Sequence, residues 1–74
     1  MVTYIKNNRS DSLITIYIVN KNYARFLEKS IKSALEQSYK NIELIIVDDN
    51  SNDNSKKIIE KYGKLKSVKF LFNK

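Results

Sequence analysis

Two adjacent carboxylates, Asp48 and Asp49, are the residues best placed to do chemistry, because they directly follow the apolar run Leu44 to Val47. Successive side chains on an extended chain point to opposite faces. We therefore expect the two carboxylates to have different roles, since they cannot both face one ligand. One can accept hydrogen bonds from loop N–H groups, as aspartates in turns often do, and the other can accept a hydrogen bond from a ligand. The alternative is that both only end the strand and cap the loop.

Other kinds of catalytic or metal chemistry have little support in the composition. The 74 residues include no Cys and no His, which removes disulfides, zinc–thiolate sites and the commonest general base. Asp48, Asp49 and Asp53 offer oxygen ligands, but no acidic partner is visible at the end of a neighbouring strand. The sequence therefore predicts no metal site and no catalytic residue in this chain.

The formal net charge of +6 would suit a polyanion such as nucleic acid, a membrane surface or a nucleotide. The lysines are scattered and form no compact block, which is typical of a solvated basic surface, and no nucleic-acid recognition motif accompanies them. No apolar run approaches the roughly 20 residues of a membrane span, and Met1 to Ser10 does not resemble a signal peptide. We expect no nucleic-acid partner, no membrane span and a cytoplasmic location.

The hydrophobic pattern predicts an α/β fold that places the two carboxylates at the end of a sheet. Helical crossovers between strands require parallel pairing, so we expect a parallel three-stranded β-α-β-α-β half of a Rossmann-like fold. Ligands of such sheets bind beyond the carboxyl ends of the strands. The predicted elements are strands at Leu13–Val19, Ile42–Val47 and Val68–Phe72, a helix from Tyr23 to Gln37, and a shorter helix containing Ile58, Ile59 and Tyr62.

The ends of these elements give further expectations. Residues 1–12 are predicted to be an N-terminal tail, and residues 13–74 an incomplete nucleotide-binding part of a larger domain. Gly63, the only glycine, is expected to end the second helix in a left-handed conformation. The strand Leu13–Val19 should have an unpaired edge that favours self-association, unless the segment Val2 to Ile5 folds back to cover it.

From Ile14 to Asn54 the chain resembles the opening of a family 2 glycosyltransferase, an inverting enzyme with a GT-A nucleotide-sugar fold. The first common feature is a hydrophobic strand followed by a loop and the run NYARFLEKSIKSALEQSYKNIEL. The second is IIVDDNSND, which stands where the family has Val-Asp-Asp-Gly-Ser-Thr-Asp. A helix at NSKKIIEKY and a strand at VKFLFNK follow in the family's order.

The resemblance assigns roles to individual residues. It implies that Asp49 recognises the base of a nucleotide sugar, most simply the ring N–H of uracil in a UDP-sugar. It places the segment Val19 to Asn22, with Lys21, beside the base, gives Ser51 the role of holding the loop near the nucleotide, and leaves Asp48 as structural support. The family usually has Pro where this chain has Val19, and a base-stacking Tyr where it has Lys21. Lys21 would instead reach a phosphate, or Tyr23 would supply the ring.

The resemblance also implies an enzyme of bacterial polysaccharide biosynthesis that transfers a hexosyl group from a nucleotide sugar to an acceptor hydroxyl. Mg²⁺ or Mn²⁺ would neutralise the leaving diphosphate in the complete enzyme. The family's Asp-x-Asp motif and catalytic base have no counterpart in these 74 residues, so we expect this chain alone to bind no metal and to be inactive. Two alternatives are a receiver domain of a response regulator, which also places acids after a buried strand, and a non-catalytic interaction fragment.

Overall fold

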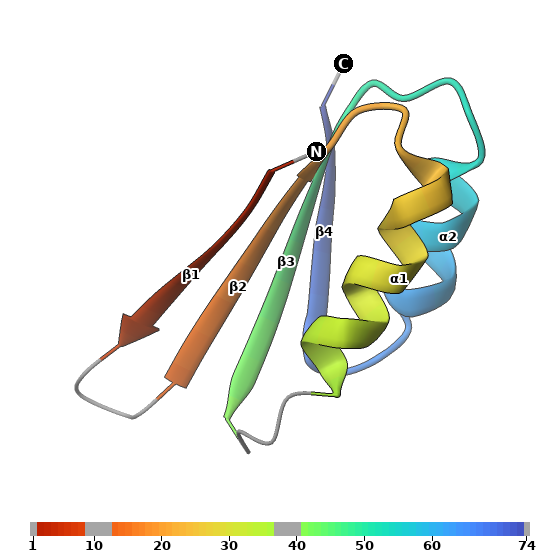
Figure 1. Cartoon of the computed structure of the whole chain (residues 1–74). Coiled ribbons are helices and arrows are strands. Elements are labelled where there is room, and N and C mark those ends of the chain that lie inside the picture. The colour runs from red at the N-terminus through yellow and green to blue at the C-terminus, as the bar shows by residue number, and fades with distance from the viewer. Residues whose placement is uncertain (1, 9–12, 37–40, 74) are drawn as a thin grey trace.

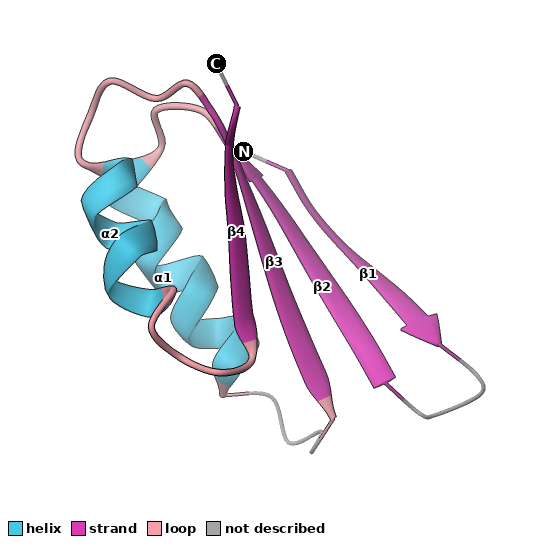
Figure 2. Cartoon of the chain, turned by 180° about the vertical axis from the view of Figure 1, so that it is seen from behind, coloured by secondary structure: helices cyan, strands magenta, loops and turns pink. Residues whose placement is uncertain are grey.

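The computed structural model describes residues 2–8, 13–36 and 41–73. They form one four-stranded sheet, with both helices on the same side of it (Figures 1 and 2). No helix of this part of the chain is long and apolar enough to cross a membrane. In chain order the elements are β1 (Val2–Asn8), β2 (Leu13–Asn20), α1 (Ala24–Leu35), β3 (Ile42–Asp49), α2 (Ser55–Tyr62) and β4 (Val68–Asn73).

The strand order is β1-β2-β3-β4, with β2, β3 and β4 parallel to one another. The predicted β-α-β-α-β unit is therefore present, and the arrangement is compatible with half of a Rossmann-like fold. The expectation of only three parallel strands is wrong, because β1 joins the sheet antiparallel to β2. The connection between the predicted helix, which was expected to reach Gln37, and the strand from Ile42 lies mainly outside the described residues.

β1 also corrects two expectations about the beginning of the chain. Residues 2–8, predicted to be a tail, pair with β2 in a register that runs from Val2 opposite Val19 to Asn8 opposite Leu13. The edge of β2 is therefore not unpaired, because β1 supplies hydrogen-bond partners for its N–H and C=O groups. Self-association through that edge has lost the structural basis on which it was predicted.

The core lies between the sheet and the two helices. Alternate residues of β2 and β3 face the helices, and on α1 the buried residues recur every three to four positions. Each fully buried Leu or Ile stabilises the fold by roughly 1.5–3 kcal/mol relative to an exposed side chain. The buried apolar residues are Ile16, Ile18, Leu27, Ile31, Ala34, Leu44, Ile46, Ile59 and Val68.

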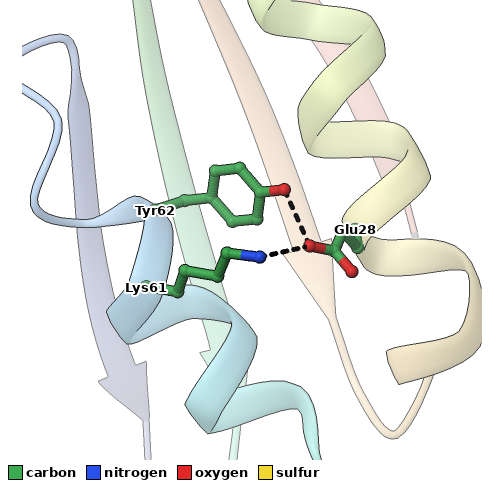
Figure 3. Close-up of polar contacts among 3 residues, drawn as sticks. All are labelled: Glu28, Lys61 and Tyr62. Atoms are coloured by element: carbon green, nitrogen blue, oxygen red, sulfur yellow. Dashed lines mark hydrogen bonds and ion pairs between the residues drawn. The ribbon is translucent and has the colours of Figure 1, made fainter.

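The two helices are joined on their outer side by a cluster of three polar residues, which we call the helix clasp: Glu28, Lys61 and Tyr62. One carboxylate oxygen of Glu28 on α1 accepts a hydrogen bond from the Tyr62 hydroxyl at 2.7 Å and lies 3.1 Å from the Lys61 ammonium (Figure 3). Both partners lie in the last turn of α2. The clasp therefore links the second turn of α1 to the end of α2.

Gly63 follows α2, but its conformation is not the one predicted. Its φ of −65° is that of an ordinary right-handed residue. The reason for glycine is instead a close approach, since a Cβ at this position would overlap two ring carbons of Phe70 on β4. The glycine lets the aromatic ring of the edge strand pack against the end of the helix.

Candidate functional site

The loops that follow β2 and β3 lie together at one end of the sheet, where the three parallel strands end (Figure 1). Each loop contains an asparagine with a left-handed backbone: Asn22 has a φ of 54° and Asn50 a φ of 55°. Asparagine tolerates this conformation better than most residues because its short side chain can form local hydrogen bonds. The two loops form the end of the sheet at which α/β folds bind ligands.

Asp48 forms the buried hydrogen bonds that order the loop after β3. Its side chain is fully buried at the end of β3. One carboxylate oxygen accepts the Ser51 N–H at 2.9 Å, and the other accepts the Ser51 hydroxyl at 2.6 Å. The Asn20 amide nitrogen, from the end of β2, donates to the same second oxygen at 2.9 Å. This buried carboxylate thus orders its own loop and connects it to the neighbouring strand.

Ser51 connects the two loops to each other. Its hydroxyl oxygen accepts the N–H of Asn22 at 2.9 Å and lies 3.2 Å from the Asn20 amide nitrogen. In return, the side-chain oxygen of Asn22 accepts the N–H of Asn52 at 2.8 Å. We call this set of five residues the loop network: Asn20, Asn22, Asp48, Ser51 and Asn52. Ser51 is 2% exposed, so it holds the loop in place and presents almost no surface to a ligand.

The electrostatics of Asp48 follow from these contacts. Burial acts to raise its pKa, since it removes the charged form from water. The hydrogen bonds from the Ser51 hydroxyl, the Ser51 N–H and the Asn20 amide favour the carboxylate and outweigh burial. The pKa of Asp48 is therefore lower than its ordinary value, and the group is ionised at neutral pH.

Asp53 joins the beginnings of the two helices. One carboxylate oxygen accepts the N–H of Ala24 at the start of α1, at 3.0 Å, and the other accepts the N–H of Ser55 at the start of α2, at 2.9 Å. These groups are among the helix N–H groups that lack an intrahelical partner. The Ser55 side chain and these N–H groups lower the pKa of Asp53. A single aspartate thus caps two helices.

The remaining predicted site residues lie around this network. Asp49 is exposed whereas Asp48 is buried, so the two carboxylates point to opposite sides, as the strand alternation predicts. Val19 is half-buried on β2. Lys21 is exposed, and its ammonium donates to the carbonyl oxygen of Asn50 at 3.3 Å. Lys21 therefore also bridges the two loops, with its charge at the surface.

A surface hollow of about 430 Å³ opens beside these loops. Tyr23 and Phe26 on its wall are 47% and 50% exposed, and their ring centroids lie 6.4 Å apart. Tyr23 was the sequence's candidate for a ring near the base, and it is accessible here. Asp49 does not line this hollow, which is formed by Asn22, Tyr23, Ala24, Arg25, Phe26, Asp53 and Asn54.

The described residues do not fit a divalent metal. No group of three or more acidic side chains comes together in this part of the chain. Both oxygens of Asp48 and both of Asp53 already accept N–H or hydroxyl groups, and Asp49 points away from Asp48. Ligands for the metal that the resemblance implies would have to come from outside these residues.

The fold and this loop network are those expected of an α/β domain that binds a ligand at the ends of its parallel strands. A family model described as "Glycosyl transferase family 2" matches residues 15–74. The chain therefore belongs to glycosyl transferase family 2. This membership leaves the receiver-domain alternative without support. The strand β1 lies before the matched residues, so the family model does not include it.

Curated proteins give the same result. An uncharacterized glycosyltransferase of Nostoc sp. is 50% identical over 46 residues, which cover 62% of this chain and 14% of the relative. One of Rickettsia typhi is 42% identical over 59 residues, or 80% and 19% of the two chains. The undecaprenyl-phosphate 4-deoxy-4-formamido-L-arabinose transferase of Proteus mirabilis is 44% identical over 62 residues, or 81% and 18%. The chain thus spans less than a fifth of each relative's length. No solved structure matches it significantly.

Two structural roles at the site were not predicted. Asn20 lies within the predicted segment Val19 to Asn22, but its full burial in register with Asp48 was not expected. The link that Asp53 makes between the starts of the two helices was not expected either. A polar residue that ends an otherwise apolar strand was the available signal for Asn20. The contact of Asp53 with Ala24 had no signal in the sequence, because it depends on how the two loops meet.

Proposed function

We propose that this chain forms the base-binding end of a nucleotide-sugar site in a family 2 glycosyltransferase. The observation that carries the proposal is the division between the two aspartates: Asp48 is buried and fully engaged, while Asp49 is exposed at the ligand end of the sheet. A free carboxylate there can accept the ring N–H of uracil in a charge-assisted hydrogen bond. The nucleotide-sugar donor, most simply a UDP-sugar, is inferred from the family.

In this proposal the other predicted residues support Asp49 and the donor. The loop network fixes the segment from Val19 to Asn22, so that its main chain lies beside the base. Lys21 is exposed and can turn its ammonium from the Asn50 carbonyl to a phosphate oxygen. Ser51 and Asp48 keep the loops in place from the interior.

Transfer of the sugar to an acceptor hydroxyl is proposed for the complete protein, in the cytoplasm, and not for this chain alone. The described residues offer neither a general base of the usual kind nor a group of acids for a metal. We therefore expect the 74-residue chain to bind a nucleotide weakly and to release no product from a nucleotide sugar.

The test is a titration of UDP into the chain, followed by the backbone amide signals in NMR spectra. Asp49→Asn should weaken UDP binding about tenfold or more, because a hydrogen bond to a charged group contributes roughly 1.5–3 kcal/mol. Glu60→Gln is the matched control: it removes one negative charge from an exposed position on α2 and should leave the affinity unchanged. Equal affinities for Asp49→Asn and the parent chain would refute the assignment.

A further inference from the structure

The outward side of α1 carries positive charge that the fold does not use. Leu27, Ile31 and Ala34 face the sheet and are buried. Arg25, Lys29 and Lys32 are exposed on the helix and recur at intervals of four and three residues, which places them along one side. Among the described residues, none of these three cations forms a salt bridge. We call this set of three the basic stripe.

The acidic residue nearest the basic stripe, Glu28, has its carboxylate engaged by α2. Glu28 lies between Arg25 and Lys32 in the sequence, but its carboxylate oxygen is held by Lys61 and Tyr62 of α2 (Figure 3). Figure 3 shows the Glu28 side chain directed across to α2. The remaining acid on this side of α1 is Glu36, which follows the last turn of the helix. Glu28 and Glu36 line the same surface hollow as the stripe and offset part of its charge, but Glu28 is shared with Lys61 and the cations remain in excess.

Exposed aromatic rings adjoin the stripe at the beginning of α1. Phe26 is 50% exposed and Tyr23 is 47% exposed, and the centres of the two rings lie 6.4 Å apart. The Arg25 guanidinium carbon lies 5.7 Å from the centre of the Phe26 ring. The row of cations is suited to the phosphates of lipid headgroups, and the apolar ring at its end is suited to the acyl chains beneath them.

We propose that the outward side of α1 docks onto an anionic membrane surface. Arg25, Lys29 and Lys32 would contact lipid phosphates, and Phe26 and Tyr23 would enter the boundary between headgroups and acyl chains. A lipid surface fits better than a nucleic acid, because half-exposed rings beside the cations gain by leaving water, and no nucleic-acid recognition motif accompanies them. The proposal rests on α1 and not on Asp49 or Ser51, so vesicle binding and UDP binding test separate claims. Tyr23, the candidate ring near the base, is the one residue common to both.

The test is co-sedimentation of the 74-residue chain with two kinds of vesicle. One kind is phosphatidylcholine containing about 30% phosphatidylglycerol, which gives it an anionic surface, and the other is pure phosphatidylcholine. The parent chain should bind the anionic vesicles alone, and about 0.5 M salt should release it. Lys29→Glu with Lys32→Glu should lower partitioning at least about 25-fold, since each basic residue contributes roughly fivefold near such a surface.

The matched control is Lys64→Glu with Lys66→Glu, which makes the same change in net charge at two exposed positions between α2 and β4. It should keep most of the binding, and Phe26→Ser should weaken binding without changing its salt dependence. Circular dichroism checks that each variant is folded. If Lys29→Glu with Lys32→Glu does not fold, the double variant Lys29→Gln with Lys32→Gln takes its place. The proposal is overturned by absence of binding to anionic vesicles, by equal loss in the control pair, or by tight binding of a DNA oligonucleotide instead.

Discussion

The loop network and the helix clasp are both polar links between distant parts of the chain, but the centre of the loop network is buried whereas the clasp faces water. Asn20 and Asp48 of the loop network are 28 residues apart and fully buried. Glu28 and Tyr62 of the clasp are 34 residues apart, and the Glu28 side chain is 35% exposed. Water can replace a lost partner in the clasp but not at the buried centre of the loop network. Similar hydrogen bonds therefore contribute differently to stability, according to what would replace them.

The largest effect should come from Asp48→Ala. This change leaves the Ser51 N–H, the Ser51 hydroxyl and the Asn20 amide without their acceptor in a buried place. Each unsatisfied buried group costs about 1–3 kcal/mol, so we expect a loss of at least about 3 kcal/mol, measured by urea unfolding. Asp49→Ala, at the exposed neighbour, should change stability by no more than about 0.5 kcal/mol. Similar losses of unfolding free energy for both variants would show that the buried carboxylate is no more important for stability than the exposed one.

Much of the fold could be predicted from local pattern. The run from Leu13 to Val19 predicted a strand, which is parallel to β3 as expected, although its other neighbour, β1, is antiparallel. The pattern that follows predicted a helix, and that helix, α1, packs against the sheet. β1 was harder to predict, because its first residues could cover an edge or remain a tail, and only the pairing with β2 decides between them. The conformation of Gly63 likewise depends on where the Phe70 ring lies.

The site was predictable only as far as strand alternation reaches. Two adjacent aspartates at a strand end had to point to opposite sides, so a difference between Asp48 and Asp49 followed from the sequence. Which of them is buried came from the resemblance and not from the pattern. The bonds of Ser51 to Asn22 and of Asp53 to Ala24 join loops about thirty residues apart. Such contacts depend on tertiary packing, about which local sequence carries little information.

An intermediate effect is expected for Asp53→Ala, because this residue is exposed but caps two helices. Loss of a capping side chain typically costs about 0.5–2 kcal/mol, and we expect about 1–2 kcal/mol here from the two N–H groups together. Asp53→Asn keeps one acceptor oxygen and should lose less. The amide signals of Ala24 and Ser55 should both shift in NMR spectra of the alanine variant. A change at Ser55 alone would mean that Asp53 does not join the two loops in solution.

The smallest effect should come from the helix clasp, through Glu28→Gln. Hydrogen bonds from Tyr62 and then Lys61 lower the pKa of Glu28 below 4.5, so the clasp contributes stability above that pH and loses it as the pH falls through the lowered value. The same bond raises the pKa of Tyr62 above 10.0, so this contribution is present below pH 10.0 and is lost as the pH rises through the raised value. The clasp therefore acts fully between these two limits.

Titration of the Tyr62 hydroxyl measures the clasp directly, even where its effect on unfolding is too small to resolve. In Glu28→Gln the hydrogen bond from Tyr62 to a carboxylate is lost, together with the charge that disfavours the phenolate. The pKa of Tyr62 should therefore fall back toward 10.0, as followed by NMR of its ring carbons. Glu36→Gln, which removes the same charge just after α1 but outside the clasp, is the control and should leave the Tyr62 titration nearly unchanged. Because water replaces the lost partner at this exposed place, Glu28→Gln should alter urea unfolding far less than Asp48→Ala. Comparable losses of unfolding free energy in the two variants would mean that burial does not determine how much each link contributes to stability.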